Sequence, residues 1–356
     1  LHRTRNQLHY ENFRPSQMSS FAYFRLPGQS QYLCVRSRQS PIELSSYAAL
    51  DATTSGYVLA PFHLSSAHPL LVITADFVQI CPLTPVLMPQ ISISKQQADE
   101  DIYRADFRHF HAALQMHTLQ KVVLARQLQV ELNTHIDPLA LFHQACALYP
   151  HAFVSLVHTP KSGTWLMATP ETLLAKLPTG TQWYTMALAG TMKQPGPWTD
   201  KNCEEQRLVA DYIEACLTPH SEQIKRSEPY VRQAAQLYHR CSDFFFTLKP
   251  STRLGDVLAE LHPTPAVCGM PKNTAQELIL REEHLQRAYY SGFSGPLNVH
   301  NTTHFFVSLR CMQLFQRRCT LYAGGGLLPA SDEQSEWNET ALKLNTMLNV
   351  LQSKSY

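Results

Sequence analysis

Residues 319–350, CTLYAGGGLLPASDEQSEWNETALKLNTMLNV, read as a strand, a glycine run, a loop with a proline and a helix. Within the helix, Glu336, Glu339 and Lys343 follow each other at intervals of three and four residues, which places them on one face. Two carboxylates on one face can offer oxygen ligands to a hard divalent cation such as Mg²⁺. A solvated helix face with one Glu–Lys pair is the more common explanation of such a pattern, so the rest of the chain must decide.

The composition is that of a globular protein: 356 residues, 44% hydrophobic and 16% charged. A net charge of +2 without a basic block argues against a nucleic-acid partner. Nine cysteines, an odd number with no C-x-x-C, favour reduced thiols and a cytoplasmic location over a disulfide framework. No apolar run of 18 residues and no signal peptide is visible, so we expect no membrane partner.

The patterns predict a single domain of mixed strands and helices. Residues 1–95 hold β-prone runs at 32–36, 57–62 and 70–80, without a chemical motif, and we expect a variable sheet portion that packs as a layer on the remainder. Residues 96–356 form the core that carries every motif. Because strands and helices interleave without regular alternation, the predicted fold class is α+β rather than a doubly wound sheet.

The expected elements of the core follow from periodicity and from capping residues. A helix should begin near Ser94 and lead into a strand at 121–132, and a second helix should run to about residue 148, with Asp137 at its N-cap. Helices are also expected at 200–217, 251–261 and 275–290, with helical patches in 219–250. The expected strands are 152–158, two strands within 164–177 that join at Pro170, 184–196, 289–299, 303–315 and 319–328.

Some charged residues stand out against apolar neighbours. Glu171 follows Pro170 between two apolar strands, where partial burial would raise the pKa of its carboxyl and suit it to donate a proton. Arg310 lies inside the run FFVSLRCMQL, and a charge within a strand core needs a partner or an anionic ligand. Lys121 and Glu205 have simpler explanations, as a rim charge and a complement to a helix dipole.

The glycines at 324–326 follow a strand but show neither G-x-G-x-x-G nor GK[ST] spacing, which argues against a nucleotide loop. They would instead let backbone N–H groups approach a small anion.

Grouped by charge, the unusual residues predict one site. The carboxylates that can hold a divalent cation are Glu205, Glu336 and Glu339, and the groups that can hold carboxylates are Arg310, Lys343 and the amides near Gly324. Lys121 and Glu171 remain as a base and an acid. The hypothesis is proton-coupled chemistry on a small polyanionic acid held through Mg²⁺.

Eight ordered motifs, from about residue 95 to the C-terminus, resemble the chorismate-utilising enzymes: isochorismate, salicylate, anthranilate and aminodeoxychorismate synthases. They are KVVLAR (121–126), TPETLLAKL (169–177), ALAGT (187–191), KNCEEQRLV (201–209), LHPTPAVCG (261–269), SLRC (308–311), LYAGGGLLPASD (321–332) and EWNETALKL (336–344). The resemblance implies a layered α/β sandwich with large antiparallel-rich sheets flanked by helices. Residues 1–95 resemble the family only in character.

Two positions separate the branches of this family. Isochorismate and salicylate synthases carry a lysine where this chain has Lys121, whereas anthranilate synthases usually have glutamine. Aminodeoxychorismate synthases place a nucleophilic lysine at the position of Ala189, which cannot attack a substrate. The resemblance therefore implies water as the nucleophile, chorismate as the substrate, no glutamine amidotransferase subunit, a monomer, and isochorismate synthase activity. A salicylate synthase, which tends to be longer, and a non-catalytic chorismate-binding protein are the alternatives.

By the same resemblance, Lys121 would be the general base that activates water for attack at C2, and Glu171 the general acid at the C4 hydroxyl. Glu205 and Glu339, with Glu336 beside them, match the Mg²⁺ carboxylates. The residues that match substrate-binding positions are Gly190, Thr191, His262, Arg310, Tyr322, Gly324 and Lys343. Gln206 departs from the histidine of many relatives, and SGFSGP (291–296) and the extra glycine at 324–326 also depart from the pattern. The product could feed menaquinone or siderophore biosynthesis.

Overall fold

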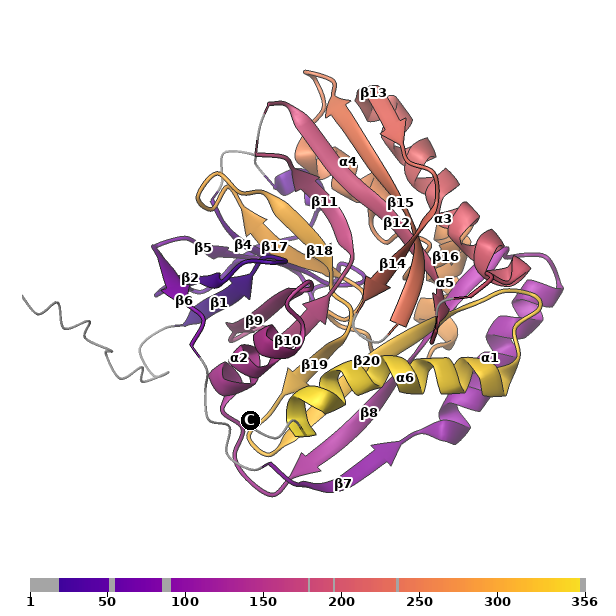
Figure 1. Cartoon of the computed structure of the whole chain (residues 1–356), viewed down its shortest axis with the longest axis horizontal. Helices are drawn as coiled ribbons and strands as arrows, with labels where there is room; N and C mark the ends of the chain where they lie inside the picture. The colour runs from indigo at the N-terminus through magenta and orange to yellow at the C-terminus, as the bar shows by residue number, and fades with distance from the viewer. Residues whose placement is uncertain are drawn as a thin grey trace, which may run out of the picture.

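Two large antiparallel sheets, flanked by helices, make up this computed structural model (Figure 1). The structure describes residues 19–50, 55–84, 91–178, 180–194, 196–234 and 237–352. The α+β class and the layered, antiparallel-rich architecture are confirmed. None of the helices in these ranges is long and apolar enough to cross a membrane.

The sheets have ten strands each. Sheet 1 runs in the order β16 (Gly269–Met270), β8 (Lys121–Leu132), β20 (Arg318–Leu327), β19 (Cys311–Leu314), β10 (Gly163–Thr169), β9 (Phe153–Thr159), β1 (Ser20–Arg25), β2 (Gln31–Ser37) and β6 (Phe77–Pro82), with β7 (Ile93–Ala98) also on β8. Sheet 2 runs in the order β13 (Ser221–Arg226), β15 (Leu237–Leu248), β12 (Gln182–Met192), β11 (Thr172–Lys176), β18 (His304–Val307), β17 (Phe293–Leu297), β4 (Gly56–Ala60), β5 (Leu70–Thr74) and β3 (Ile42–Leu44), with β14 (Tyr230–Ala234) also on β15.

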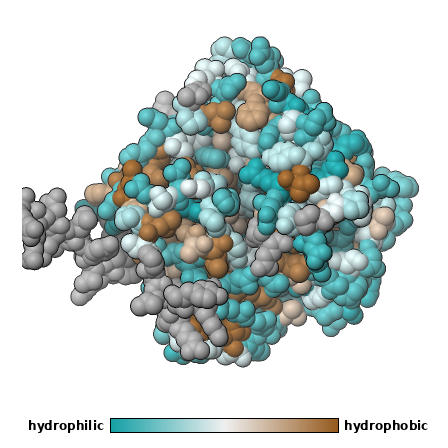
Figure 2. All heavy atoms as spheres, in the orientation of Figure 1, coloured by the Kyte–Doolittle hydropathy of each residue, from teal (hydrophilic) through white to brown (hydrophobic). Residues whose placement is uncertain are grey.

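Apolar side chains fill the space between the sheets and beneath the helices. Between the sheets, the rings of Phe153 and Phe306 stack with their centroids 4.0 Å apart. Outside sheet 1 lie α2 (Pro138–Leu148) and α6 (Glu333–Gln352), and α1 (Glu100–Gln115) and α5 (Lys272–Glu282) pack near β8. Outside sheet 2 lie α3 (Asp200–Leu217) and α4 (Leu254–Leu261). The short 3-10 helices are η2 (Tyr47–Ala49) and η3 (Thr218–His220). The face drawn in Figure 2 is mostly hydrophilic, with its hydrophobic residues in small scattered groups.

The N-terminal strands do not form a layer of their own, and that expectation was wrong. β1, β2 and β6 extend sheet 1 beyond β9, while β4, β5 and β3 extend sheet 2 beyond β17. The registers pair Tyr23 with Leu156 and Val58 with Gly295. The edges of β9 and β17 carry unpaired backbone groups, which the N-terminal strands satisfy.

Three further expectations need correction. No helix begins near Ser94, because residues 93–98 pair with the edge of β8 as β7 and the helix starts at Glu100. The described part of 219–250 forms three strands instead of helical patches, since β15 pairs with β12 on one side and with β13 and β14 on the other. The helix expected over 275–290 ends at Glu282, whereas α2 and α3 have the predicted bounds.

Two segments cross between the sheets side by side. β10 of sheet 1 continues through Pro170 and Glu171 into β11 of sheet 2, and β18 of sheet 2 continues through 308–310 into β19 of sheet 1. Val307 N–H donates to the carbonyl of Glu171 at 3.0 Å, and Ala168 N–H donates to the carbonyl of Arg310 at 3.0 Å. The two crossings therefore bring Glu171 and Arg310 to one place.

Candidate active site

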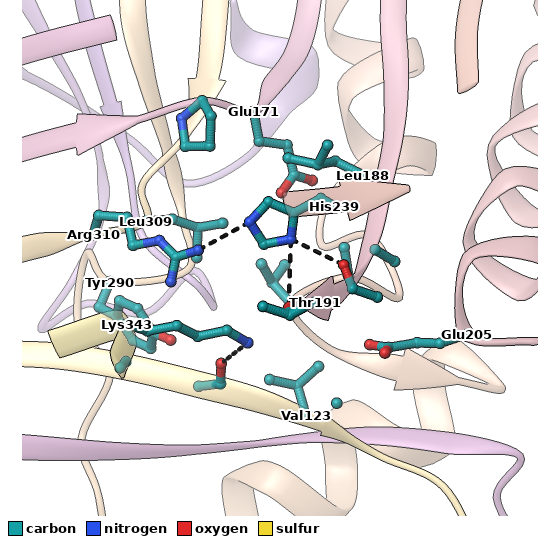
Figure 3. Close-up of a pocket in the computed structure, with 18 residues that line it drawn as sticks. Val123, Glu171, Leu188, Thr191, Glu205, His239, Tyr290, Leu309, Arg310 and Lys343 are labelled. Carbon is teal, nitrogen blue, oxygen red and sulfur yellow. Dashed lines mark hydrogen bonds between the residues drawn. The ribbon is translucent and has the colours of Figure 1, made fainter. Parts of the chain in front are cut away.

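A pocket opens at the crossings, between the two sheets and helix α6 (Figure 3). It holds about 620 Å³ of space without protein atoms. Its lining comes from β8, β12, β15, β20, α3, α6, the two crossings, the loop after α4 and the segment after α5: Val123, Pro170, Glu171, Leu188, Ala189, Gly190, Thr191, Glu205, His239, Ala266, Val267, Tyr290, Leu309, Arg310, Ala323, Gly324, Gly326 and Lys343. Seven of the twelve residues proposed from the sequence are among them.

The proposed acid, Glu171, is 3% exposed, so the expectation that it is buried is confirmed. Burial raises the pKa of its carboxyl to about 8, although the positive charges of Lys121, Arg310 and Lys343 oppose the shift. The carboxyl is therefore protonated at neutral pH and able to donate a proton.

Arg310 does not sit inside a strand, as the apolar run around it suggested. The run breaks after Val307, and Arg310 occupies the turn before β19 with a positive φ of 47°. Its guanidinium makes no ion pair with any described residue. Nη2 of Arg310 lies 3.4 Å from Nε2 of His239. Its accessible surface faces this pocket and a neighbouring one. A cation in this setting suits an anionic ligand.

His239, which the sequence patterns did not single out, forms the wall opposite Arg310 (Figure 3). Burial, together with the positive charges of Arg310 and Lys343, lowers the pKa of its ring to about 3, so the ring is neutral. Nδ1 lies 3.0 Å from the carbonyl oxygen of Gly190. A hydrogen on Nδ1 would satisfy that carbonyl and leave Nε2 as the acceptor for Arg310.

The neighbourhood of β8 and α3 holds the first proposed metal carboxylate. Glu205 Oε1 lies 2.9 Å from Nζ of Lys121, whose side chain is fully buried. A Cβ added at Gly326 would come within 2.2 Å of Glu205 Oε1 and 2.8 Å of the Lys121 Cε. Lys121 therefore lies directly behind the lining, and only glycine at 326 leaves room for this pair.

The two α6 carboxylates are also paired with lysines. Glu339 lies 2.7 Å from Lys343, which in turn donates to the Gly324 carbonyl at 2.9 Å. Glu336 pairs with Lys201 and accepts from Ser331 at 2.8 Å, both through Oε1. Burial pushes the pKa of Glu339 up, but the ammonium groups of Lys343 and Lys201 outweigh it and leave that pKa lowered.

Carboxylates are suitable ligands for a divalent cation, but these three are not grouped around one point in the described structure. Within the described ranges, no three His, Cys, Asp or Glu side chains are grouped closely enough to hold a metal. Glu336 Oε2 is nevertheless buried without a hydrogen-bond partner in the described structure, and a Cβ at Gly325 would approach it to 3.1 Å. An orphaned carboxylate oxygen beside glycine, in an all-carboxylate set, fits a hard cation such as Mg²⁺.

The glycine run lies within strand β20, where residues 324–326 pair with residues 123–125 of β8. This geometry differs from a nucleotide-binding loop between a strand and a helix. A Cβ at Gly324 would approach the Tyr290 hydroxyl to 2.7 Å. The glycines therefore make room for the side chains of the site.

Two proposed substrate-binding residues lie outside the lining. His262 is buried, with Nε2 3.1 Å from the Pro61 carbonyl and its ring packed on Phe293. Tyr322 stacks between Trp165 and Tyr290 in the core between the sheets. Tyr322 thus packs behind Tyr290 of the lining, and the contact of His262 and Tyr322 with substrate remains a prediction.

Comparison with known proteins shows one consistent likeness. Residues 84–352 match the model of a family described as chorismate binding enzyme. Isochorismate synthase EntC of Escherichia coli strain K12 is 30% identical over 245 residues, which cover 65% of this chain and 62% of EntC. A putative isochorismate synthase MenF of Mycobacterium tuberculosis is 32% identical over 255 residues, 65% of this chain and 68% of that protein. The chain thus aligns with just under two thirds of the length of EntC.

The crystal structure of a putative 2,3-dihydroxybenzoate-specific isochorismate synthase, DhbC from Bacillus anthracis, has the same fold. It superimposes with a TM-score of 0.81, at 23% identity, over 96% of this chain and 97% of that one.

Proposed function

The chain belongs to the family of chorismate binding enzymes, and on that premise we propose that it is an isochorismate synthase, an isomerase that converts chorismate reversibly to isochorismate. The observation that carries the proposal is Glu171, a buried carboxyl that is protonated at neutral pH in a pocket with Arg310 and Lys343. Such a pocket suits a dianion that must lose a hydroxyl group.

The proposed reaction adds one water and releases another. Lys121, in its neutral form, takes a proton from water as the oxygen attacks C2 of chorismate. The ring double bonds shift, the C4–O bond breaks, and Glu171 gives its proton to the departing hydroxyl, which leaves as water. The burial of Glu171 supports this role, since a carboxyl ionised at neutral pH has no proton to give.

Substrate binding is assigned to the cationic part of the pocket. Arg310 and Lys343, with backbone groups around Gly324, would hold the enolpyruvyl carboxylate. Gly190 and Thr191 would complete the substrate-binding wall, where the Gly190 carbonyl oxygen and the Thr191 hydroxyl lie 3.0 and 3.4 Å from Nδ1 of His239.

Glu205 and Glu339 would hold Mg²⁺, with Glu336 beside them. When bound, Mg²⁺ would supply positive charge that neutralises and orients the ring carboxylate. Lys201 would then keep its role as the partner of Glu336.

Water as nucleophile requires no ammonia, so we propose that the chain acts without a glutamine amidotransferase subunit. From the resemblance to the family we also propose a monomer, and from the nine cysteines without C-x-x-C a cytoplasmic location. The product would enter menaquinone or siderophore biosynthesis. Relatives are named for either route: MenF of Escherichia coli is described as menaquinone-specific, and an isochorismate synthase of Vibrio cholerae as vibriobactin-specific.

The test is incubation with chorismate and Mg²⁺, with separation of the products by chromatography. We expect isochorismate from the native chain and a loss on the order of a thousandfold in Lys121→Gln, because the base is removed. Salicylate as the main product would make the chain a salicylate synthase. Tight chorismate binding without product would make it a non-catalytic binding protein, and normal turnover by Lys121→Gln would refute the base.

A further inference from the structure

A second Glu–Arg combination lies on the other edge of β8, behind the pocket. Glu283 and Arg287 are four residues apart in the non-helical segment after α5. Their side chains are buried and paired twice, Nε to Oε2 at 2.6 Å and Nη2 to Oε1 at 2.7 Å. The Arg287 guanidinium also lies over the Phe62 ring, 4.4 Å from its centroid. We call this pair the Glu283–Arg287 clamp.

The clamp is bonded to the backbone of β8. Nη2 of Arg287 donates to the Val123 carbonyl at 2.7 Å, and Oε1 of Glu283 accepts from the Ala125 N–H at 2.9 Å. β16 pairs with β8 only at Lys121 and Val122. The two side chains thus take over where the neighbouring strand ends, and they satisfy groups that a longer strand would have bonded.

The same clamp reaches the wall of the pocket. Nη1 of Arg287 donates to the carbonyl of Val267, and the backbone carbonyl of Arg287 accepts from the Tyr290 N–H at 2.9 Å. Val123, Val267 and Tyr290 all line the pocket. One guanidinium therefore joins β8, the loop after α4 and the segment after α5.

We propose that Glu283 and Arg287 are positioning residues, which fix β8 so that Lys121 and Val123 keep their places relative to the pocket. Neither residue lines the pocket, so their action passes through the β8 backbone. The turnover test rests on the proposed function, whereas the structural test below does not.

The decisive variant removes both charges at once. A lone buried charge destabilises strongly, but replacing a buried ion pair with apolar side chains of similar size is often neutral. Glu283→Leu with Arg287→Met therefore leaves no lone buried charge, and the variant should still fold. Its Tm should be lower than that of the wild type, because the Val123 and Val267 carbonyls and the Ala125 N–H lose their partners. Arg253→Met with Asp256→Leu, which removes an exposed pair, is the matched control.

We expect the clamp variant to lower kcat about 10- to 100-fold with little change in KM, because a misplaced base slows chemistry more than binding. Amide exchange in 121–126, followed by mass spectrometry, should accelerate at least about tenfold, and the control should change neither. Arg287→Lys keeps the positive charge but loses the planar set of guanidinium donors. Its kcat and its exchange rate in 121–126 should lie between those of the wild type and those of the clamp variant.

Wild-type kcat in the folded clamp variant would overturn the positioning role, and so would unchanged exchange in 121–126. If the double variant does not fold, Arg287→Lys decides by the same two measurements. If the wild-type chain does not convert chorismate, the proposed function fails, while the exchange measurement still tests whether the clamp holds β8.

Discussion

The molecule contains two Glu–Arg combinations close to one pocket, and they differ in how they are paired. In the clamp, Arg287 makes four donor contacts, two to Glu283 and two to backbone carbonyls. At the crossings, Arg310 faces neutral His239, and neither Arg310 nor Glu171 forms an ion pair with a described residue. Glutamate and arginine therefore stabilise the fold in the clamp, whereas at the crossings a charge remains available for a ligand.

The physical basis of the difference is the availability of partners. A buried charge needs compensation, and Arg287 finds it in protein groups alone. Arg310 is held by a backbone turn between the two sheets. It contacts the neutral ring of His239, and the negative charge of Glu339, which acts on Arg310 without an ion pair, is already paired with Lys343. An anionic substrate would supply the compensation that the protein withholds.

The largest effect should come from Glu171→Gln, which keeps the shape but removes the transferable proton. We expect turnover to fall on the order of a thousandfold with no loss in Tm. Glu283→Gln should act mainly on stability: the Tm should fall, because Arg287 loses its counter-charge. Equal loss of stability in both variants would erase the contrast between the two carboxyls.

The pH dependence of turnover and of stability tests the role of Glu171 in a second way. Glu171 has a pKa of about 8, so its proton is present below pH 8 and lost above it. Turnover should therefore decline about tenfold per pH unit above pH 8. Stability should also decline as pH rises from about 4.5 to 8, because the unfolded chain releases this proton first. A rate that is constant to pH 10 would contradict the assignment.

Next in size is Arg310→Met, which removes the unpaired cation. The expected change is on the order of a hundredfold in kcat/KM for chorismate, without a lower Tm, since no protein ion pair is broken. Arg287→Met should instead lower the free energy of unfolding by about 3–5 kcal/mol. Thermal unfolding together with steady-state kinetics checks both, and destabilisation by Arg310→Met would show that it has a structural partner.

The smallest effect concerns Lys201, which neutralises Glu336 without touching the pocket lining. Lys201→Met should tighten Mg²⁺ binding about fivefold, because a cation that competes for the buried Glu336 carboxylate is removed. Isothermal titration calorimetry with MgCl₂ measures it, and Lys225→Met, an exposed lysine of β13, is the control. Weaker binding in Lys201→Met would mean that Lys201 helps to hold the cation site.

Much of the site was visible in the sequence because its motifs are short and local. Strand 121–132 and helices α2 and α3 agree with prediction, because periodicity and caps such as Asp137 act within a few residues. His239 could not be found in this way. It reaches Gly190 only because β15 pairs with β12, and its burial follows from that pairing.

The sequence by itself determined which residue types are present at which spacing: a helix face with Glu336, Glu339 and Lys343, a carboxyl after Pro170, and an arginine in an apolar run. Only the tertiary structure decided that residues 308–310 break that run and that Arg310 forms no ion pair with a described residue. It also decided that Arg287, with a glutamate four residues before it, is compensated by residues up to 164 positions distant. Spacing is a local property, whereas burial and pairing depend on contacts between strands far apart in the chain.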